Sequence, residues 1–174
     1  YFRRQRLSLA RNVEPEIRKK PDSKRQKRLS ILLADTNGCR YRALVESLAR
    51  QSLDRDSFEI VACDVFDQVP PHIMENAETV LVCGQDEHLY NRNAAFNFAF
   101  IESSSPLLVY SDGDQPLPED ALAQILAAAE AAPTPHTVFV NSDGITRETI
   151  HTVVLSRDAV VDAGGLDESA YFAG

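Results

Sequence analysis

Pro106-Leu107-Leu108-Val109-Tyr110-Ser111-Asp112-Gly113-Asp114 is the stretch that decides the fold. Its apolar run from Leu107 to Tyr110 is typical of a buried β-strand, because it is too short and too rich in β-forming residues for a helix. The strand ends in two carboxylates one residue apart, which repel each other unless positive charge lies nearby. A hard divalent cation takes such oxygen ligands and often bridges a carboxylate to phosphate groups. The spacing alone leaves a solvated Asp-Gly-Asp turn as an equal alternative.

Further buried strands and amphipathic helices alternate along the chain. One helix should present an apolar face made of Tyr41, Leu44, Val45 and Leu48. Pro70-Pro71 should break the chain before the third strand. We expect strands at 29–34, 58–63, 79–83, 107–111, 137–140 and 149–155, and further helices over about 87–102, 118–132 and 156–164. This alternation predicts an α/β fold with a mainly parallel sheet flanked by helices.

The charge of the chain divides sharply after residue 28. Residues 1–28 contain eleven Lys or Arg against three acidic residues, whereas residues 29–174 contain seven Arg against 23 acidic residues. We therefore expect a basic N-terminal arm, residues 1–28, followed by one domain, residues 29–174. The arm is suited to peripheral contact with an anionic membrane surface more than to nucleic acid. A solvated tail, or docking on the chain's own acidic domain, are the alternatives.

The three cysteines, Cys39, Cys63 and Cys83, form an odd set without the spacing of metal ligands. Cys63 and Cys83 each close an apolar strand, where a free thiol packs as a small buried group. This usage indicates a reducing, cytoplasmic setting, at the inner face of the membrane if the arm binds lipid. No apolar run approaches the roughly 20 residues that a membrane-spanning helix needs.

Acidic residues follow three of the predicted strands. Asp35, Asp64 and the pair Asp112 and Asp114 come directly after them. The carboxyl ends of parallel strands meet at one edge of a sheet, which is also where ligands bind in open α/β folds. A carboxylate can accept hydrogen bonds from a base or ribose, but it needs a metal ion to hold a diphosphate. The pattern therefore predicts a nucleotide site with a divalent metal.

From Leu29 to Gly174 the chain resembles the family 2 glycosyltransferases, which have the Rossmann-like GT-A fold of nucleotide-diphospho-sugar transferases. The first two similar segments are SILLADTNGCRYRALVESLARQ and FEIVACDVFD. The more specific segments are NAAFNFAFIESSSPLLVYSDGD, which resembles a helix running into the family's Asp-x-Asp motif, and VVLSRDAVVDAGGLDES, which resembles its Gly-Gly-Phe-Asp-Glu element.

The resemblance implies a metal-dependent transfer of a sugar from a nucleotide-diphosphate sugar, with a UDP-sugar as the foremost donor and inversion as the expected outcome. Asp64 would bind the base, and Asp112 the ribose or diphosphate region. Asp114, together with Asp112, would bind Mn²⁺ or Mg²⁺. The implied nucleotide-binding set is Asp35, Thr36, Asn37, Asp64, Asn97 and Asp112. Asp167 and Glu168 match the Gly-Gly-Phe-Asp-Glu element on the acceptor side.

The chain also departs from the family pattern. Ala34 and Thr36 replace a usual proline and an aromatic residue, and Leu166 replaces the phenylalanine. Phe96 stands where an arginine is common, which removes one phosphate partner. The family's catalytic base lies in an acidic pair just after the Gly-Gly-Phe-Asp-Glu element, so we expect the base beyond Gly174 and the chain to be a truncated part of a longer protein.

Two other functions compete with this interpretation. ILLADTNGCRYRAL faintly resembles the opening loop of the sugar-phosphate nucleotidyltransferases, but no lysine follows Lys27 and Asp35 and Thr36 replace small residues. A non-catalytic nucleotide-sugar-like module, acting through the basic arm, is the second alternative. The intact pair of Asp112 and Asp114 opposes the non-catalytic alternative.

Overall fold

A computed structural model describes residues 14–22, 26–34, 41–83, 92–111, 115–131, 137–140 and 152–167 of the 174-residue chain. Seven strands form one sheet in the order β1-β4-β3-β2-β5-β7-β6. The strands are β1 Glu16–Lys19, β2 Leu29–Ala34, β3 Phe58–Asp64, β4 Thr79–Val82, β5 Leu107–Ser111, β6 Thr137–Val140 and β7 Thr152–Ser156. The helices are α2 Arg42–Leu48, α3 Pro71–Asn76, α4 Arg92–Glu102, α5 Ala121–Ala131 and α6 Arg157–Ala163, with a short 3₁₀ helix at Arg55–Ser57.

The centre of the sheet is parallel and its flanks are antiparallel. β2 pairs in parallel with both β3 and β5, and β3 pairs in parallel with β4. β1 runs antiparallel to β4, and β7 runs antiparallel to both β5 and β6. The mainly parallel α/β sheet predicted from the sequence is confirmed for this central part. The parallel arrangement does not extend to β7, because the chain returns beside β5 in the opposite direction.

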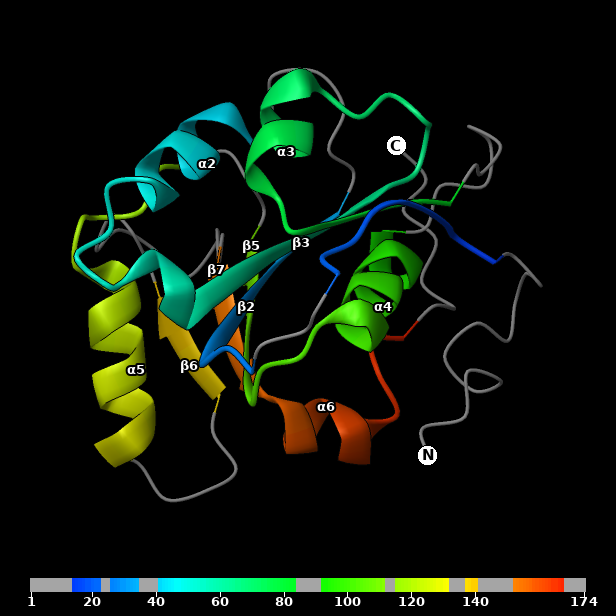
Figure 1. Cartoon of the computed structure of the whole chain (residues 1–174). Helices are drawn as coiled ribbons and strands as arrows, with labels where there is room; N and C mark the ends of the chain where they lie inside the picture. Colours follow the sequence, from blue (N-terminus) through cyan, green and yellow to red (C-terminus); the bar gives the residue numbers. More distant parts are fainter. Residues whose placement is uncertain are drawn as a thin grey trace.

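Helices cover both faces of the sheet (Figure 1). One core lies between the sheet and α2, α3 and α5, and the other between the sheet and α4 and α6. Every residue of β2 is buried, because alternate side chains of this central strand enter the two cores. Leu29, Ile31 and Leu33 contribute to the first core, and Leu32 and Ala34 to the second. The arrangement is therefore a three-layer α/β sandwich.

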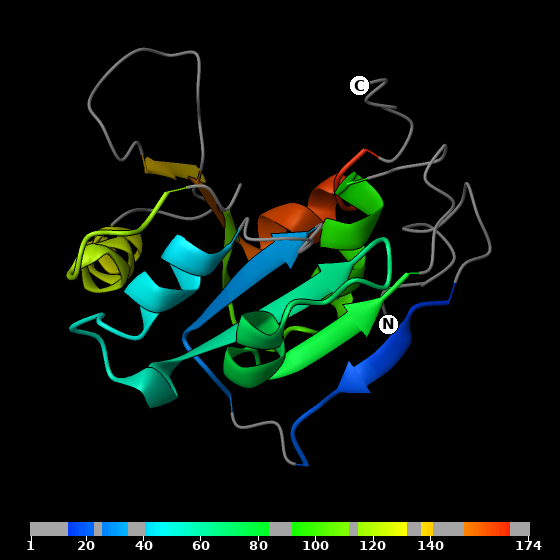
Figure 2. The ribbon, with the colours of Figure 1, turned by 90° about the horizontal axis from the view of Figure 1, so that it is seen from above.

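Most predicted elements lie where the sequence places them, and the main differences involve proline and charge. Pro70-Pro71 does not simply break the chain, because Pro71 begins α3, where its missing N–H is no loss. Residues 16–19, which the charge pattern assigns to the arm, form β1 at the edge of the sheet beside β4 (Figure 2). Residues 1–13 lie outside the described part of the chain.

Basic side chains of residues 18–28 contact carboxylates of the body. Arg18 binds Asp67 through both carboxylate oxygens at 3.1 Å, and Lys20 binds Glu102 at 2.8 Å. Further ion pairs join Lys27 to Asp56 and Arg28 to Glu130. These contacts favour the docking alternative for this part of the arm. Within the described ranges, no helix is both long enough and apolar enough to cross a bilayer.

A buried polar cluster closes the opposite, amino-terminal edge of the central strands. Glu59 of β3 is buried, and its Oε1 accepts hydrogen bonds from Ser30 Oγ at 2.6 Å and from the N–H and Oγ of Ser104 at 2.6 and 2.9 Å. Arg157 donates from Nε to the carbonyl of Ser105 and from Nη2 to Ser103 Oγ. The cluster fixes the loop between α4 and β5, and with it the start of the strand that leads to Asp112.

Candidate functional site

Three central strands end together at the carboxyl edge of the sheet. In the parallel registers, Ala34 of β2 lies beside Cys63 of β3, and Leu33 lies beside Ser111 of β5. The chain runs from these ends into Asp35, through Asp64, and into Asp112. The predicted meeting of these strands at one edge is therefore present in the fold, and it rests on the direct pairing of β2 with both neighbours.

Asp64 ends β3 and organises the loop that follows. Its side chain is fully buried, and Oδ2 accepts hydrogen bonds from the backbone N–H of Phe66 at 3.2 Å and of Gln68 at 2.8 Å. The turn brings Asp67 to a φ of 55°, in the left-handed region that aspartate tolerates better than most residues. The carboxylate thus holds the 65–68 turn at the edge where the base pocket is predicted.

Tyr41 connects the ends of two strands, although its sequence pattern predicts only part of an apolar helix face. Its ring lies in the core on the α2 side of the sheet. Its hydroxyl donates to the carbonyl oxygen of Ala34 at 2.7 Å and also lies within hydrogen-bond distance, 3.3 Å, of the carbonyl oxygen of Ser111. Arg92 Nη2 donates to the same hydroxyl at 3.4 Å. A tyrosine just before a helix, with a polar loop on its other side, is the signal that could have indicated this role.

Arg92 is the first residue of α4, and its guanidinium lies over an aromatic ring and next to the Tyr41 hydroxyl. Its guanidinium carbon lies 5.6 Å from the centroid of the Phe96 ring, one helical turn further on. Phe96 in turn makes an edge-to-face contact with Tyr110, with 5.2 Å between the ring centroids. The Tyr110 hydroxyl is buried and has no hydrogen-bond partner among the described residues, and burial raises the pKa of this phenol.

Asn97 joins α4 to the segment after α6. Its Nδ2 donates to the carbonyl of Leu166, and its Oδ1 accepts from the N–H of Leu166, both at 2.9 Å. One turn earlier, Asn93 Nδ2 donates to the carbonyl of Asp167 at 2.7 Å. Asn97 is 1% exposed, so this contact satisfies a buried amide. The structure thus places Asn97 against the Gly-Gly-Leu-Asp segment.

The glycines of that segment end α6. Ser156 caps the helix start, because its Oγ accepts a hydrogen bond from the N–H of Ala159. At the other end, Gly164 has a φ of 81°, and the N–H groups of Gly164 and Gly165 bind the carbonyls of Val161 and Val160. This is a Schellman motif, in which glycine adopts the left-handed conformation at no steric cost. It turns the chain back toward Asn97.

Cys63 and Cys83 lie at the carboxyl ends of β3 and β4, next to Asp64. Their Sγ atoms are 3.1 Å apart, and both side chains are buried and free, as the sequence predicts. Burial raises the pKa of the Cys63 thiol well above its ordinary value, and the neighbouring Cys83 adds to the shift. The Cys63 thiol is therefore protonated near neutral pH, and both side chains pack as apolar groups of the second core.

Other predicted site residues lie outside the described part of the chain. These are Asp35, Thr36, Asn37, Asp112, Asp114 and Glu168. Among the residues that the structure does describe, no group of three or more His, Cys, Asp or Glu side chains could hold a metal ion. The described part of the site therefore consists of the strand ends, Asp64, the junction of Tyr41 and Arg92, and the segment bound by Asn93 and Asn97.

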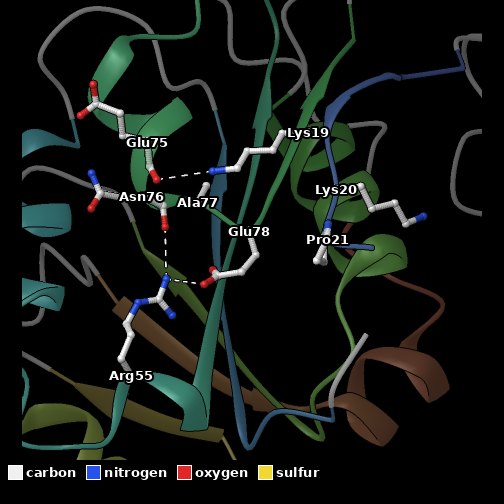
Figure 3. A pocket seen from close by; sticks show the side chains of 8 residues that line it. All are labelled: Lys19, Lys20, Pro21, Arg55, Glu75, Asn76, Ala77 and Glu78. Carbon is white, nitrogen blue, oxygen red and sulfur yellow. Dashed lines mark hydrogen bonds and ion pairs between the residues drawn. The ribbon is translucent and has the colours of Figure 1, made fainter. Parts of the chain in front are cut away.

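A separate hollow of about 350 Å³ lies between the end of β1 and the residues around α3 (Figure 3). Lys19 Nζ donates to the carbonyl of Met74 at 2.7 Å, and Arg55 donates to the carbonyl of Asn76 at 3.2 Å and to Glu78. Both cations therefore bind groups at the end of α3 and just beyond it. This hollow contains none of the residues predicted for the nucleotide site.

The fold is shared with solved glycosyltransferase structures. The chain superposes on the mannosyltransferase PcManGT from Pyrobaculum calidifontis, in complex with GDP-Man and Mn²⁺, with a TM-score of 0.69 at 17% identity, over 93% of this chain and 52% of that one. It superposes on residues 1–349 of S. aureus TarS, in complex with UDP, with a TM-score of 0.59 at 14% identity, over 84% of this chain and 52% of that one.

These similarities establish a GT-A-like α/β fold. No family model matches the sequence, and no curated protein matches it. The chain spans about half the length of the two solved structures.

Proposed function

We propose that this chain is the donor-binding part of a metal-dependent glycosyltransferase that uses a nucleotide-diphosphate sugar. The observation that carries the proposal is the meeting of β2, β3 and β5 at one edge, each strand leading into or ending in an acidic residue. The same fold carries GDP-Man and Mn²⁺ in PcManGT and UDP in TarS, which supports a donor of this class. Inversion at the sugar is part of the proposal and rests on the resemblance of the sequence.

The proposed division of roles follows the order of the strands. Asp35, Thr36 and Asn37 line the base pocket beside the 65–68 turn that Asp64 organises. Asp112 contacts the ribose or diphosphate region, and Asp114 with Asp112 binds the metal. Two carboxylates one residue apart supply the hard oxygen ligands that Mn²⁺ and Mg²⁺ prefer, so the donor chemistry of this pair fits the ion. Such an ion would stabilise charge that develops on the leaving diphosphate.

The acceptor side is proposed at the segment after α6. Asn93 and Asn97 fix the backbone of Leu166 and Asp167 against α4, which begins at the same edge of the sheet. The segment therefore lies beside the first two turns of α4, the helix that starts with Arg92 at the ends of β2 and β5. We propose that Asp167 and Glu168 border the acceptor.

Calorimetric titration tests the donor site directly. UDP, GDP and dTDP are titrated into the full chain with and without Mn²⁺, and the series is repeated on Asp114→Ala. We expect one nucleoside diphosphate to bind with Mn²⁺ and to lose most of its affinity in Asp114→Ala. Asp162→Ala, which removes an exposed carboxylate of α6, serves as the matched control and should bind as the wild type does. Absence of binding by all three nucleotides in every condition would refute the proposal.

A further inference from the structure

A nucleoside diphosphate that approaches the carboxyl edge meets an acidic protein. Residues 29–174 contain 23 acidic residues and seven arginines, and the strand ends at this edge lead into further aspartates. The proposed metal ion offsets part of this negative charge, and a basic side chain at the same edge would offset more of it. Arg55 and Arg157 do not fill this role, because Arg55 binds the carbonyl of Asn76 and Glu78, and Arg157 binds the loop at the amino edge.

Arg92 has the required position. Its Nη2 lies 3.4 Å from the hydroxyl of Tyr41, and that hydroxyl bridges the carbonyls of Ala34 and Ser111. These are the last residues of β2 and β5, directly before Asp35 and Asp112 in the chain. The guanidinium therefore lies at the junction of the two strands from which the proposed donor site is built.

The surroundings of Arg92 also fix its orientation. The guanidinium lies over the ring of Phe96, and the side chain is half-buried. A planar guanidinium held on an aromatic face loses little further freedom when it binds, and its fork of N–H donors matches phosphate oxygens. Arg92 is also the first residue of the eleven-residue helix α4, whose positive dipole end adds to the attraction for an anion.

We propose that Arg92 contacts the diphosphate of the nucleotide donor and that Tyr41 positions its guanidinium. This inference rests on the proposed function and adds to it the residue that takes over phosphate binding where Phe96 stands in place of arginine. Arg92 makes the contact with the phosphate, and Tyr41 acts only through the hydrogen bond that its hydroxyl accepts from Arg92.

The test compares ligands that differ only in their phosphates. UDP, UMP and uridine, or the guanosine series if GDP is the preferred nucleotide, are titrated into the wild type, Arg92→Gln, Arg92→Lys and Tyr41→Phe in the presence of Mn²⁺. Arg92→Gln should weaken binding of the diphosphate by about 10- to 100-fold, the range for loss of a charge-assisted hydrogen bond. The nucleoside should bind unchanged. The affinity of Arg92→Lys for the diphosphate should lie between those of the wild type and Arg92→Gln. Tyr41→Phe should lose less affinity for the diphosphate than Arg92→Gln does.

Arg50→Gln is the matched control, because Arg50 is an exposed arginine just after α2. It should bind all three ligands as the wild type does. Equal affinity of Arg92→Gln and the wild type for the diphosphate overturns the inference and leaves the proposed function standing. An equal loss for diphosphate and nucleoside also overturns it, since the residue would then act only on the fold. If Arg92→Gln does not fold, the ratio of diphosphate to nucleoside affinity in Arg92→Lys decides. Failure of the wild type to bind any nucleotide overturns the proposed function, and this inference with it.

Discussion

The side-chain amide of Asn97 and the backbone of Leu166 form a closed pair of hydrogen bonds, in which each partner donates once and accepts once at 2.9 Å. The contact joins the middle of α4 to a segment 69 residues further along the chain. Because the amide is buried, its loss leaves two backbone groups of Leu166 to find other partners.

Replacement of Asn97 by alanine should therefore destabilise the domain. Two hydrogen bonds are lost at a buried site, so the free energy of unfolding should fall by about 1–3 kcal/mol. Urea unfolding followed by circular dichroism measures this change. Asn93→Ala, which removes one hydrogen bond at an exposed position, should cost less. A larger loss for Asn93→Ala than for Asn97→Ala would contradict the role given to the buried amide.

Gly164 provides a test of the turn itself. A Cβ added at this residue meets no atom within 4 Å, so only the backbone opposes a side chain. The φ of 81° should make Gly164→Ala cost about 1–2 kcal/mol of stability, since the left-handed conformation is disfavoured for alanine. Gly164→Asn should cost less, because asparagine tolerates this region better. Equal stability of wild type and Gly164→Ala in urea would show that the turn can relax.

Glu59 should matter to stability although it lies far from the predicted nucleotide site. Its carboxylate accepts three hydrogen bonds within the buried cluster at the amino edge. Glu59→Gln places an amide among these donors and should lower the free energy of unfolding by about 1–3 kcal/mol. Glu130→Gln is the control, because the exposed pair of Glu130 with Arg28 should contribute at most about 1 kcal/mol. A smaller effect at Glu59 than at Glu130 would argue against the cluster.

His72 should make stability depend on pH. Burial, together with the nearby charge of Arg42, lowers the pKa of this imidazole below its ordinary value of 6.5, against the opposing effects of Glu46 and Glu75. The unfolded chain therefore binds the proton first as the pH falls. The contribution of His72 is fully present above about pH 6.5 and is lost as the pH drops through the folded-state pKa. Urea midpoints of wild type and His72→Gln across this window should converge toward acid pH. Parallel curves would exclude the effect.

The sequence allows most of the fold to be predicted because its central strands are fully apolar. Leu29–Ala34 and Leu107–Ser111 match the predicted ranges, and Phe58–Asp64 is longer by one residue. Such runs have few alternatives to a buried strand. β1 could not be found this way, since Glu16–Lys19 has only one apolar residue and its pairing depends on the exposed edge of β4. The helix at Pro71 was missed because proline at a first turn looks the same as proline in a loop.

The candidate site could likewise be predicted only in part. The acids that follow the strands were visible as a pattern, because their positions depend only on where the strands end. The roles of Tyr41 and Arg92 were not visible, because they depend on a contact between the Tyr41 hydroxyl and Arg92 Nη2 across 51 residues of chain. For Asn97 the resemblance implies a place in the nucleotide-binding set. Its partner, the backbone of Leu166, could not be inferred from residue types.

The pairing of β1 with β4 has a consequence for how the protein behaves in solution. Without β1, β4 would present a row of unpaired N–H and C=O groups along an apolar strand, which is a template for association between molecules. β1 covers that row with four residues, three of them charged. A chain shortened to begin at Leu29, where the charge pattern sets the domain boundary, should therefore self-associate as its concentration rises, and one that begins at Glu14 should not. Residues 16–19 thus act as a protective border of the sheet.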